Sequence, residues 1–216
     1  MESEGGLNEL DSLGVLPPAL WARQEAGLAR STNRERVYGG EHDKLAELIL
    51  YISDRHETDE YYGSVRLAKT LFYADFLFSA NTGQSITGKR YVRRDQGPMP
   101  ADLLGTRDRL QREGALVMKE RLVHGYTQKR PIAIRAADLS AFTADEIAIV
   151  DYVLGELEGV SATAVSELSH RFKAWELAED GEEIPYQTAF LSERQPSADD
   201  HAFARKLALE HADEAA

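Results

Sequence analysis

Apolar residues recur with helical spacing in two consecutive stretches that follow residue 42. In "DKLAELILYISDR" they occupy positions 45, 48, 49 and 52, with Asp43 near the start, and this spacing predicts a helix. In "GSVRLAKTLFYADFLFSA" the stripe that predicts a second helix consists of Leu67, Leu71, Ala74 and Phe78. We expect Ser64 to be its N-cap and the "NTG" at 81–83 to end it.

One carboxylate, that of Asp75, falls inside this second apolar stripe, about 80° from Leu67 on a helical wheel. Burying a lone charge is costly, so this group needs a partner or a chemical role. We expect it to accept N–H bonds from the glycine-bounded "TGQSITG" turn or to pair with Arg90 or Arg93. Lys69 lies on another side of the wheel, and we expect it to be a surface lysine whose amine reaches solvent.

The pattern changes between residues 83 and 100, where glycines and prolines disfavour a helix and Tyr91 and Val92 indicate a short strand. The stretch "ADLLGTRDRLQREGAL" then predicts a helix that ends at Gly114. The runs "LVMKERLV" and "RPIAIRA", separated by "HGYTQK", predict a β-hairpin. A helix followed directly by a hairpin is similar to the end of a winged-helix unit.

Further helical segments follow the hairpin. Thr143 and Glu146 form a capping box ahead of "FTADEIAIVDYVLGEL", and Ser161 caps a shorter helix in "SATAVSELSHRF". The stretch "KAWELAEDGEEIPY" predicts a helical turn that ends at Gly181. The predicted fold is mainly α with some β (α+β), a compact helical domain with a small β-hairpin that could be winged-helix-like.

Three regions follow from this pattern. Residues 1–42 form an N-terminal extension and linker, in which Leu20 and Trp21 could dock on the body or bind a partner. Residues 43–190 form the helical domain. Residues 191–216 are a polar tail with a frayed helix from Ala198 to His211, because that segment has few apolar residues to anchor it.

Composition changes this picture mainly through charge. The chain of 216 residues has a net charge of −12 and no cysteine, which excludes thiol catalysis and disulfides and favours the cytoplasm. No apolar run is long enough to span a bilayer. The charges are segregated along the chain. Residues 86–135 carry twelve Lys/Arg and five Asp/Glu, whereas residues 138–186 carry two Lys/Arg and twelve Asp/Glu. The two segments could neutralise each other, or a basic face could meet an acidic partner or nucleic acid.

Most catalytic chemistries lack their sequence signature. The six histidines show no metal-ligand spacing, and no phosphate-binding glycine loop or GxSxG elbow occurs. We therefore expect no metal and no cofactor. A small hydrolase that uses Asp75 and His170 is conceivable only if the two side chains meet in an open cleft. The alternative for His170 and Trp175 is that they hold the last helices to the core.

Three motifs in the correct order resemble the Panacea domain of SocA-like antitoxins. They are "RLAKTLFYAD" at 66–75, "TGQSITGKRYVRRDQGPMP" at 82–100 and "LSHRFKAWELAEDGEEIPY" at 168–186. Arg66 stands where that family usually has lysine. The positions that match the family pattern are Lys69, Asp75, Gly83, Ile86, Gly88, Tyr91, Gly97, Pro98, Ser169, His170, Trp175, Gly181, Ile184 and Tyr186.

The resemblance implies a noncatalytic role. Panacea antitoxins neutralise a cognate protein toxin by direct contact, and the SocA-like branch implies that the antitoxin could deliver its toxin to a protease such as ClpXP. A basic face is the expected partner-binding region and contains Arg90, Arg93, Arg94, Lys119, Arg121, Lys129 and Arg130. The alternative is a winged-helix-like transcriptional regulator that binds operator DNA through the helix at 101–113 and the basic hairpin.

Overall fold

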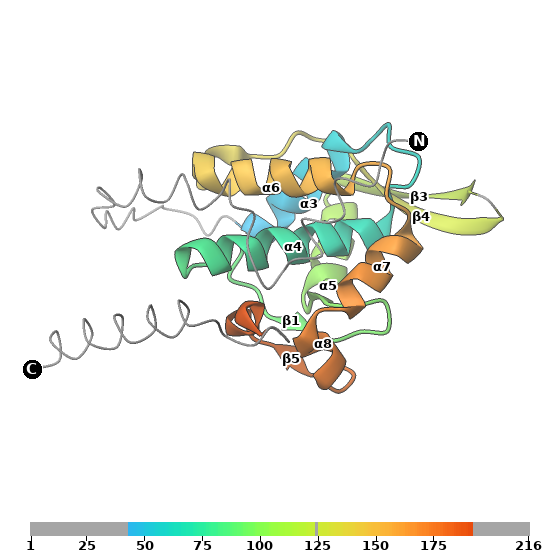
Figure 1. Cartoon of the computed structure of the whole chain (residues 1–216). Coiled ribbons are helices and arrows are strands. Elements are labelled where there is room, and N and C mark those ends of the chain that lie inside the picture. Colours follow the sequence, from blue (N-terminus) through green and yellow to red (C-terminus); the bar gives the residue numbers. More distant parts are fainter. Residues whose placement is uncertain (1–42, 124, 192–216) are drawn as a thin grey trace, which may run out of the picture.

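A single long helix, α4 (Ser64–Thr82), runs through the middle of the molecule (Figure 1). The computed structural model describes residues 43–123 and 125–191. Every residue of α4 from Arg66 to Ser79 is buried, because other elements cover the helix on all sides. Its partners include α3 (Lys44–Arg55), α6 (Ala144–Leu157) and α7 (Ala162–His170). A helix that is buried all round belongs to the core rather than to one face of it.

The long helix ends as its sequence predicts and begins one residue away from the prediction. Gly83 adopts φ +74° as the C-cap of α4, which is the left-handed conformation that glycine favours. Ser64, the predicted N-cap, is instead the first helical residue, and Gly63 is the N-cap. The Ser64 hydroxyl donates to the carbonyl oxygen of Lys129 at 3.0 Å. This serine therefore ties the helix to the hairpin rather than capping it.

The predicted hairpin is present, but its second strand begins earlier than expected. The helix α5 (Leu103–Arg112) leads directly into β3 (Leu116–Val123), which pairs antiparallel with β4 (Tyr126–Ala133). The sequence "YTQK" belongs to β4 and not to the predicted connection between the strands. The two strands project from the helices at one end of the molecule (Figure 1).

A second, smaller sheet has the strand order β2-β1-β5. Its strands are β1 (Tyr91–Val92), β2 (Met99–Pro100) and β5 (Glu183–Ile184), and both pairings are antiparallel. The pattern predicts β1 but not β5, which follows the predicted end of the helical turn at Gly181. The helix there, α8 (Lys173–Leu177), ends earlier. A two-residue strand has no periodicity of its own, so only its long-range partner defines it.

The other helix starts agree with the sequence. The capping box of Thr143 and Glu146 is formed at α6, and the Ser161 side chain accepts from the N–H of Ala164 at α7. Two 3-10 helices, Leu139–Ala141 and Tyr186–Phe190, complete the described elements. The expectations for residues 1–42 and for the tail after residue 191 fall outside the described residues, with the exception of Leu191 itself. None of the described helices has the length and apolarity that crossing a bilayer would need.

Candidate functional site

Asp75 is 1% exposed, and its carboxyl group joins α4 to the turn at 86–87, to Tyr91 and to the distant Tyr186. Its Oδ1 accepts the N–H groups of Ile86 at 2.8 Å and Thr87 at 2.9 Å. Its Oδ2 contacts the Thr87 hydroxyl, and the Tyr91 hydroxyl lies at 2.8 Å. The Tyr186 hydroxyl is farther from Oδ2, at 3.4 Å, and donates to the carbonyl oxygen of Lys89 at 2.8 Å.

These contacts decide between the two partners that the sequence predicted for Asp75. The carboxyl group bonds to the glycine-bounded turn, as the first expectation stated. Neither arginine is its partner: Arg90 lies 3.5 Å from a carboxylate oxygen of Glu183, and the Arg93 guanidinium lies 4.6 Å from the centroid of the Trp175 ring. Asp75 thus fixes the turn, and the turn leads directly into β1.

The environment of Asp75 favours its neutral form. Burial raises the pKa of Asp75, and the hydrogen bonds from Thr87, Tyr91 and Ile86 oppose that rise only in part. Burial beside Asp75 also raises the pKa of Tyr91 well above its usual value. The rings of Phe72, Phe76 and Tyr186 surround these groups and exclude water. The site is therefore a closed structural clamp and not an open reaction centre.

Lys69 is buried, which makes our expectation of a surface lysine wrong. The residue is 2% exposed, and its amine donates to the carbonyl oxygen of Pro98 at 2.8 Å. Desolvation lowers the pKa of Lys69 to about 7, because burial disfavours the charged form. The helical wheel failed here because α4 is covered on the side that we took for the solvent face.

Gly97 lies directly against this amine. It adopts φ +99°, and a Cβ atom built on it would lie 2.7 Å from Nζ of Lys69 and 2.1 Å from Oγ of Ser169. Both distances are too short for a real side chain, so the position accepts only glycine without rearrangement. The three residues belong to three different motifs of the sequence, and the fold brings them into contact.

His170 and Trp175 form a second cluster, separate from Asp75. Their rings stack with centroids 3.9 Å apart, and the Trp175 indole N–H donates to the carbonyl oxygen of Arg94 at 2.9 Å. The cluster holds α7 and α8 to the segment after β1, as the packing interpretation predicted. Asp75 is enclosed by its own partners, so the hydrolase hypothesis lacks the open cleft that it requires.

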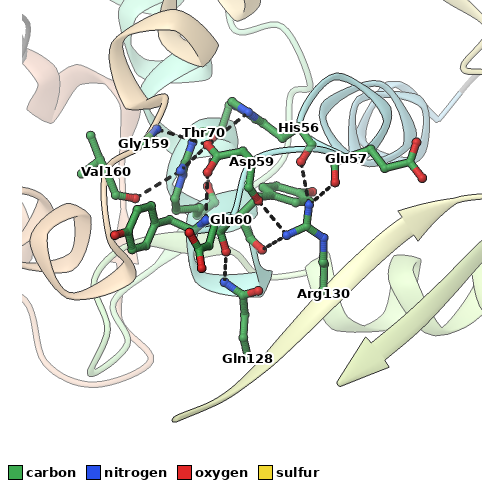
Figure 2. Close-up of polar contacts among 12 residues, drawn as sticks. His56, Glu57, Asp59, Glu60, Thr70, Gln128, Arg130, Gly159 and Val160 are labelled. Atoms are coloured by element: carbon green, nitrogen blue, oxygen red, sulfur yellow. Dashed lines mark hydrogen bonds and ion pairs between the residues drawn. The ribbon is translucent and has the colours of Figure 1, made fainter. Parts of the chain in front are cut away.

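Arg130 is an anchor of the hairpin, and its assignment to an exposed basic face is corrected by its burial. It is 6% exposed and reaches from β4 into the turn between α3 and α4 (Figure 2). Its guanidinium donates to the carbonyl oxygens of Asp59 at 2.7 Å and His56 at 3.0 Å, and also to those of Glu57 and Tyr62. Two of these carbonyl oxygens, those of His56 and Asp59, also accept backbone N–H groups within the turn, so Arg130 adds a charged donor to a turn that is partly bonded already.

Behind this turn lies an ion pair that the sequence did not reveal. Arg66 is completely buried and lies 2.7 Å from a carboxylate oxygen of Asp59, and it also donates to the carbonyl oxygen of Val160 at 3.1 Å. Burial alone would raise the pKa of Asp59, but the N–H groups of Tyr61 and Gly159, with Arg66, lower it. The pair links the turn to the loop between α6 and α7 (Figure 2).

His56 lies beside the same pair. Its Nδ1 is 3.6 Å from a carboxylate oxygen of Asp59. Desolvation and the neighbouring guanidinium of Arg66 lower the pKa of His56 to about 4, against the opposing effect of Asp59. A hydrophobic pattern gives no signal for this cluster, because its members are polar and their contacts cross up to a hundred residues of sequence.

The remaining residues of the predicted basic face fall into two groups. Lys119, Arg121 and Lys129 are exposed on the hairpin. Arg90, Arg93 and Arg94 lie in or beside β1, where Arg90 and Arg94 face Glu183 and Asp180 at 3.5 Å each. Two arginines beside β1 thus pair with the acidic segment, whereas the three hairpin cations stand on strands that project from the helices (Figure 1).

The comparisons with known proteins give one match. Residues 67–176 match the model of a family described as "Antitoxin SocA-like, Panacea domain". The match includes Lys69, Asp75, Gly97 and the whole hairpin, and it leaves Tyr186 outside. No curated protein and no solved structure matches the chain. Because the matched segment covers half of the chain, we conclude that this protein belongs to the SocA-like antitoxin family with a Panacea domain.

Proposed function

We propose that this protein neutralises a cognate toxin by direct protein–protein contact and that the exposed surface of the hairpin forms part of the interface. The observation that carries the proposal is the family match over residues 67–176. The role is noncatalytic, and the buried Asp75 clamp supports it because that site organises backbone and offers no open cleft.

The hairpin has the composition of a binding surface. Leu122 is 73% exposed and Tyr126 is 82% exposed, so both large apolar side chains are available for contact with a partner. Next to them stand the exposed cations Lys119, Arg121 and Lys129. Arg121 lies 3.9 Å from a carboxylate oxygen of Glu60, and both side chains are half exposed. An apolar tip flanked by cations fits a partner that has an apolar patch and nearby carboxylates.

The hairpin is also held rigidly at its base, which favours binding because little order must be created on association. Arg130 joins β4 to the turn before α4, and the Ser64 hydroxyl joins the start of α4 to Lys129. The exposed residues of the hairpin thus stand on a fixed base.

Co-expression tests the proposal. The product of the neighbouring open reading frame is expressed with tagged wild-type protein, with a charge-reversed hairpin (Lys119→Glu, Arg121→Glu and Lys129→Glu) and with Leu177→Ser. Leu177 is 68% exposed on α8, so the last variant controls for loss of an exposed apolar residue elsewhere. We expect the wild type and Leu177→Ser to co-purify the toxin, and the reversed hairpin to lose it. A toxic neighbour that co-purifies with none of them contradicts the proposal.

Delivery of the toxin to a protease such as ClpXP would be a second step of the same function. It predicts that the toxin disappears faster in cells that contain both this protein and the protease than in cells that lack either. A toxin half-life that is unchanged by the protease limits the mechanism to direct neutralisation.

One observation supports operator binding as a second candidate function. Helix α5 leads directly into the basic hairpin, as a recognition helix leads into a wing. The cations of α5 are partly engaged, since Arg109 bonds to Asp43 at 2.7 Å and Arg107 to Asp108 at 3.2 Å. A mobility-shift assay on the promoter of its own operon, across a salt series, tests this function. No shift at micromolar protein and low salt rejects it.

A further inference from the structure

A groove opens beside the base of the hairpin, and its residues are not explained by the clamp at Asp75. It has a volume of about 590 Å³ and lies between the first turns of α4, the segment from Arg94 to Met99, and α5. Its walls are mostly apolar and include Val65, Ala68, Met99, Leu103 and Leu104. Leu104 is 51% exposed there, so this side chain is available for contact with an added apolar group.

Two basic side chains, Lys69 and Arg107, line this apolar groove. The ammonium form of Lys69 carries three N–H donors, and its amine donates to the carbonyl oxygen of Pro98. The Arg107 guanidinium lies 3.2 Å from a carboxylate oxygen of Asp108 at one end, whereas its buried Nε has no hydrogen-bond partner among the described residues. A buried donor without an acceptor is unfavourable, so an occupant that supplies an acceptor here gains free energy.

Two carboxylates also line the groove, and they do not cancel this preference. Asp180 faces Arg94 at 3.5 Å, which engages both groups. Asp95 is exposed and lies next to the opening. The unmet capacity of the groove is therefore for a hydrogen-bond acceptor with negative charge, placed between apolar walls.

The groove is continuous with the proposed toxin-binding surface. Ser64 lines the groove, and its hydroxyl donates to the carbonyl oxygen of Lys129, whose side chain is exposed on the hairpin. A partner that covers the hairpin can therefore reach the groove without crossing the helical core. This continuity selects a segment of the toxin as the occupant over an unrelated molecule.

We propose that the groove binds an apolar segment of the toxin that carries a carboxylate, with Lys69 and Arg107 as the groups that recognise the carboxylate and Leu104 as an apolar contact. This inference rests on the proposed function and names a further surface for it. Gly97 is part of the site because a side chain there would occupy the space next to the amine of Lys69.

Calorimetric titration of the purified toxin into the full chain tests this inference. The variants are Lys69→Met, which removes the charge at similar length, Arg107→Gln, and Leu104→Glu, which places a negative charge on the apolar wall. The matched control is Leu177→Glu, which makes the same change on exposed α8. We expect each groove variant to weaken toxin binding at least tenfold, and the control to stay within twofold of the wild type. Melting temperatures are measured in parallel, and Lys69→Met is expected to melt no lower than the wild type.

The outcomes separate the two proposals. If the wild type binds the toxin and all three groove variants bind within twofold of it, the groove inference is wrong and the proposed function stands. If the wild type does not bind, the proposed function itself fails. A synthetic peptide of residues 1–21, which contains four acids and no base, is added as a competitor. If this peptide displaces the toxin, or if the protein forms a dimer that the Leu104→Glu substitution dissociates, the groove binds a segment of this same protein. Either result would overturn the proposal.

Discussion

The hydroxyl of Tyr91 lies 2.8 Å from Oδ2 of Asp75 and 2.9 Å from the carbonyl oxygen of Leu71. A phenol has one proton, so it cannot donate fully to both acceptors. A protonated Asp75 resolves the conflict, since it donates to Tyr91 while Tyr91 donates to Leu71. The rise in the pKa of Asp75 that burial produces agrees with this arrangement.

Substitutions at Asp75 should therefore separate its hydrogen bonds from its charge. Asp75→Ala removes the acceptor of the Ile86 and Thr87 N–H groups and of the Thr87 hydroxyl, and it leaves Tyr91 with only the carbonyl oxygen of Leu71. We expect it to lower the free energy of unfolding by about 3 kcal/mol or more. Asp75→Asn keeps the acceptor for Ile86 and Thr87 and should cost less than half as much. Urea denaturation measures both. Equal losses would show that the negative charge, and not the acceptor, is what the fold requires.

The same pair predicts a pH dependence. The pKa of Asp75 is higher in the folded protein than in the unfolded chain. Its contribution to stability is therefore complete at a pH below the unfolded pKa, and it is lost as the pH rises through the folded pKa. The stability of Asp75→Asn relative to the wild type should therefore increase as pH rises from 4. Denaturation at a series of pH values checks this, and a difference that is constant with pH would rule out a raised pKa.

His56 predicts the opposite trend at acidic pH. Burial lowers the pKa of His56 from its usual 6.5 to about 4, so the neutral imidazole stabilises the fold above pH 6.5, and that contribution is lost as pH falls toward 4. The full loss is roughly 3 kcal/mol from a shift of this size. His56→Gln should flatten the decline of stability between pH 6.5 and 4, as measured by thermal unfolding. An unchanged slope in the variant would exclude His56 as its source.

Arg130 should matter for stability, and its neighbour Lys129 should not. Arg130→Met removes the charged donor from four carbonyl oxygens of the turn before α4, two of which keep a backbone N–H partner, and we expect a loss of about 3 kcal/mol in the free energy of unfolding. Lys129→Met makes a similar change on the exposed side of the same strand and should stay within about 0.5 kcal/mol of the wild type. Chemical denaturation compares the two. Similar values would mean that Arg130 is not an anchor.

Gly97 and Gly88 offer a matched pair of glycines with positive φ. An added Cβ at Gly88 meets nothing within 4 Å, whereas at Gly97 it collides with Ser169 and Lys69. Gly88→Ala should therefore cost about 1 kcal/mol, from backbone strain alone. Gly97→Ala should cost at least twice as much, because packing must also rearrange. Melting temperatures rank the two, and the reverse order would contradict the contact between Gly97 and Lys69.

Local sequence patterns predicted the helices well because caps and apolar periods are local. The start of α6 and the pinning of the "TGQSITG" turn by Asp75 followed from residues close to each other in the sequence. The burial of Lys69 did not, since the residues that cover its amine come from positions 97, 98 and 169. For Lys129 and Arg130, strand alternation requires that the two face opposite sides. Which of them points inward depends on the turn at 56–62, which no local pattern reveals.

The central claim is that the protein neutralises a toxin through the surface around its hairpin, and growth rescue tests it most directly. Cells express the neighbouring open reading frame alone, with the wild type, or with the triple variant Lys119→Glu, Arg121→Glu and Lys129→Glu, in which the anchor Arg130 is retained. We predict that the neighbour alone arrests growth, that the wild type restores it, and that the triple variant, folded to the same melting temperature, does not. Full rescue by the triple variant would contradict the role of the hairpin, and an arrest that the wild type does not relieve would contradict the antitoxin function.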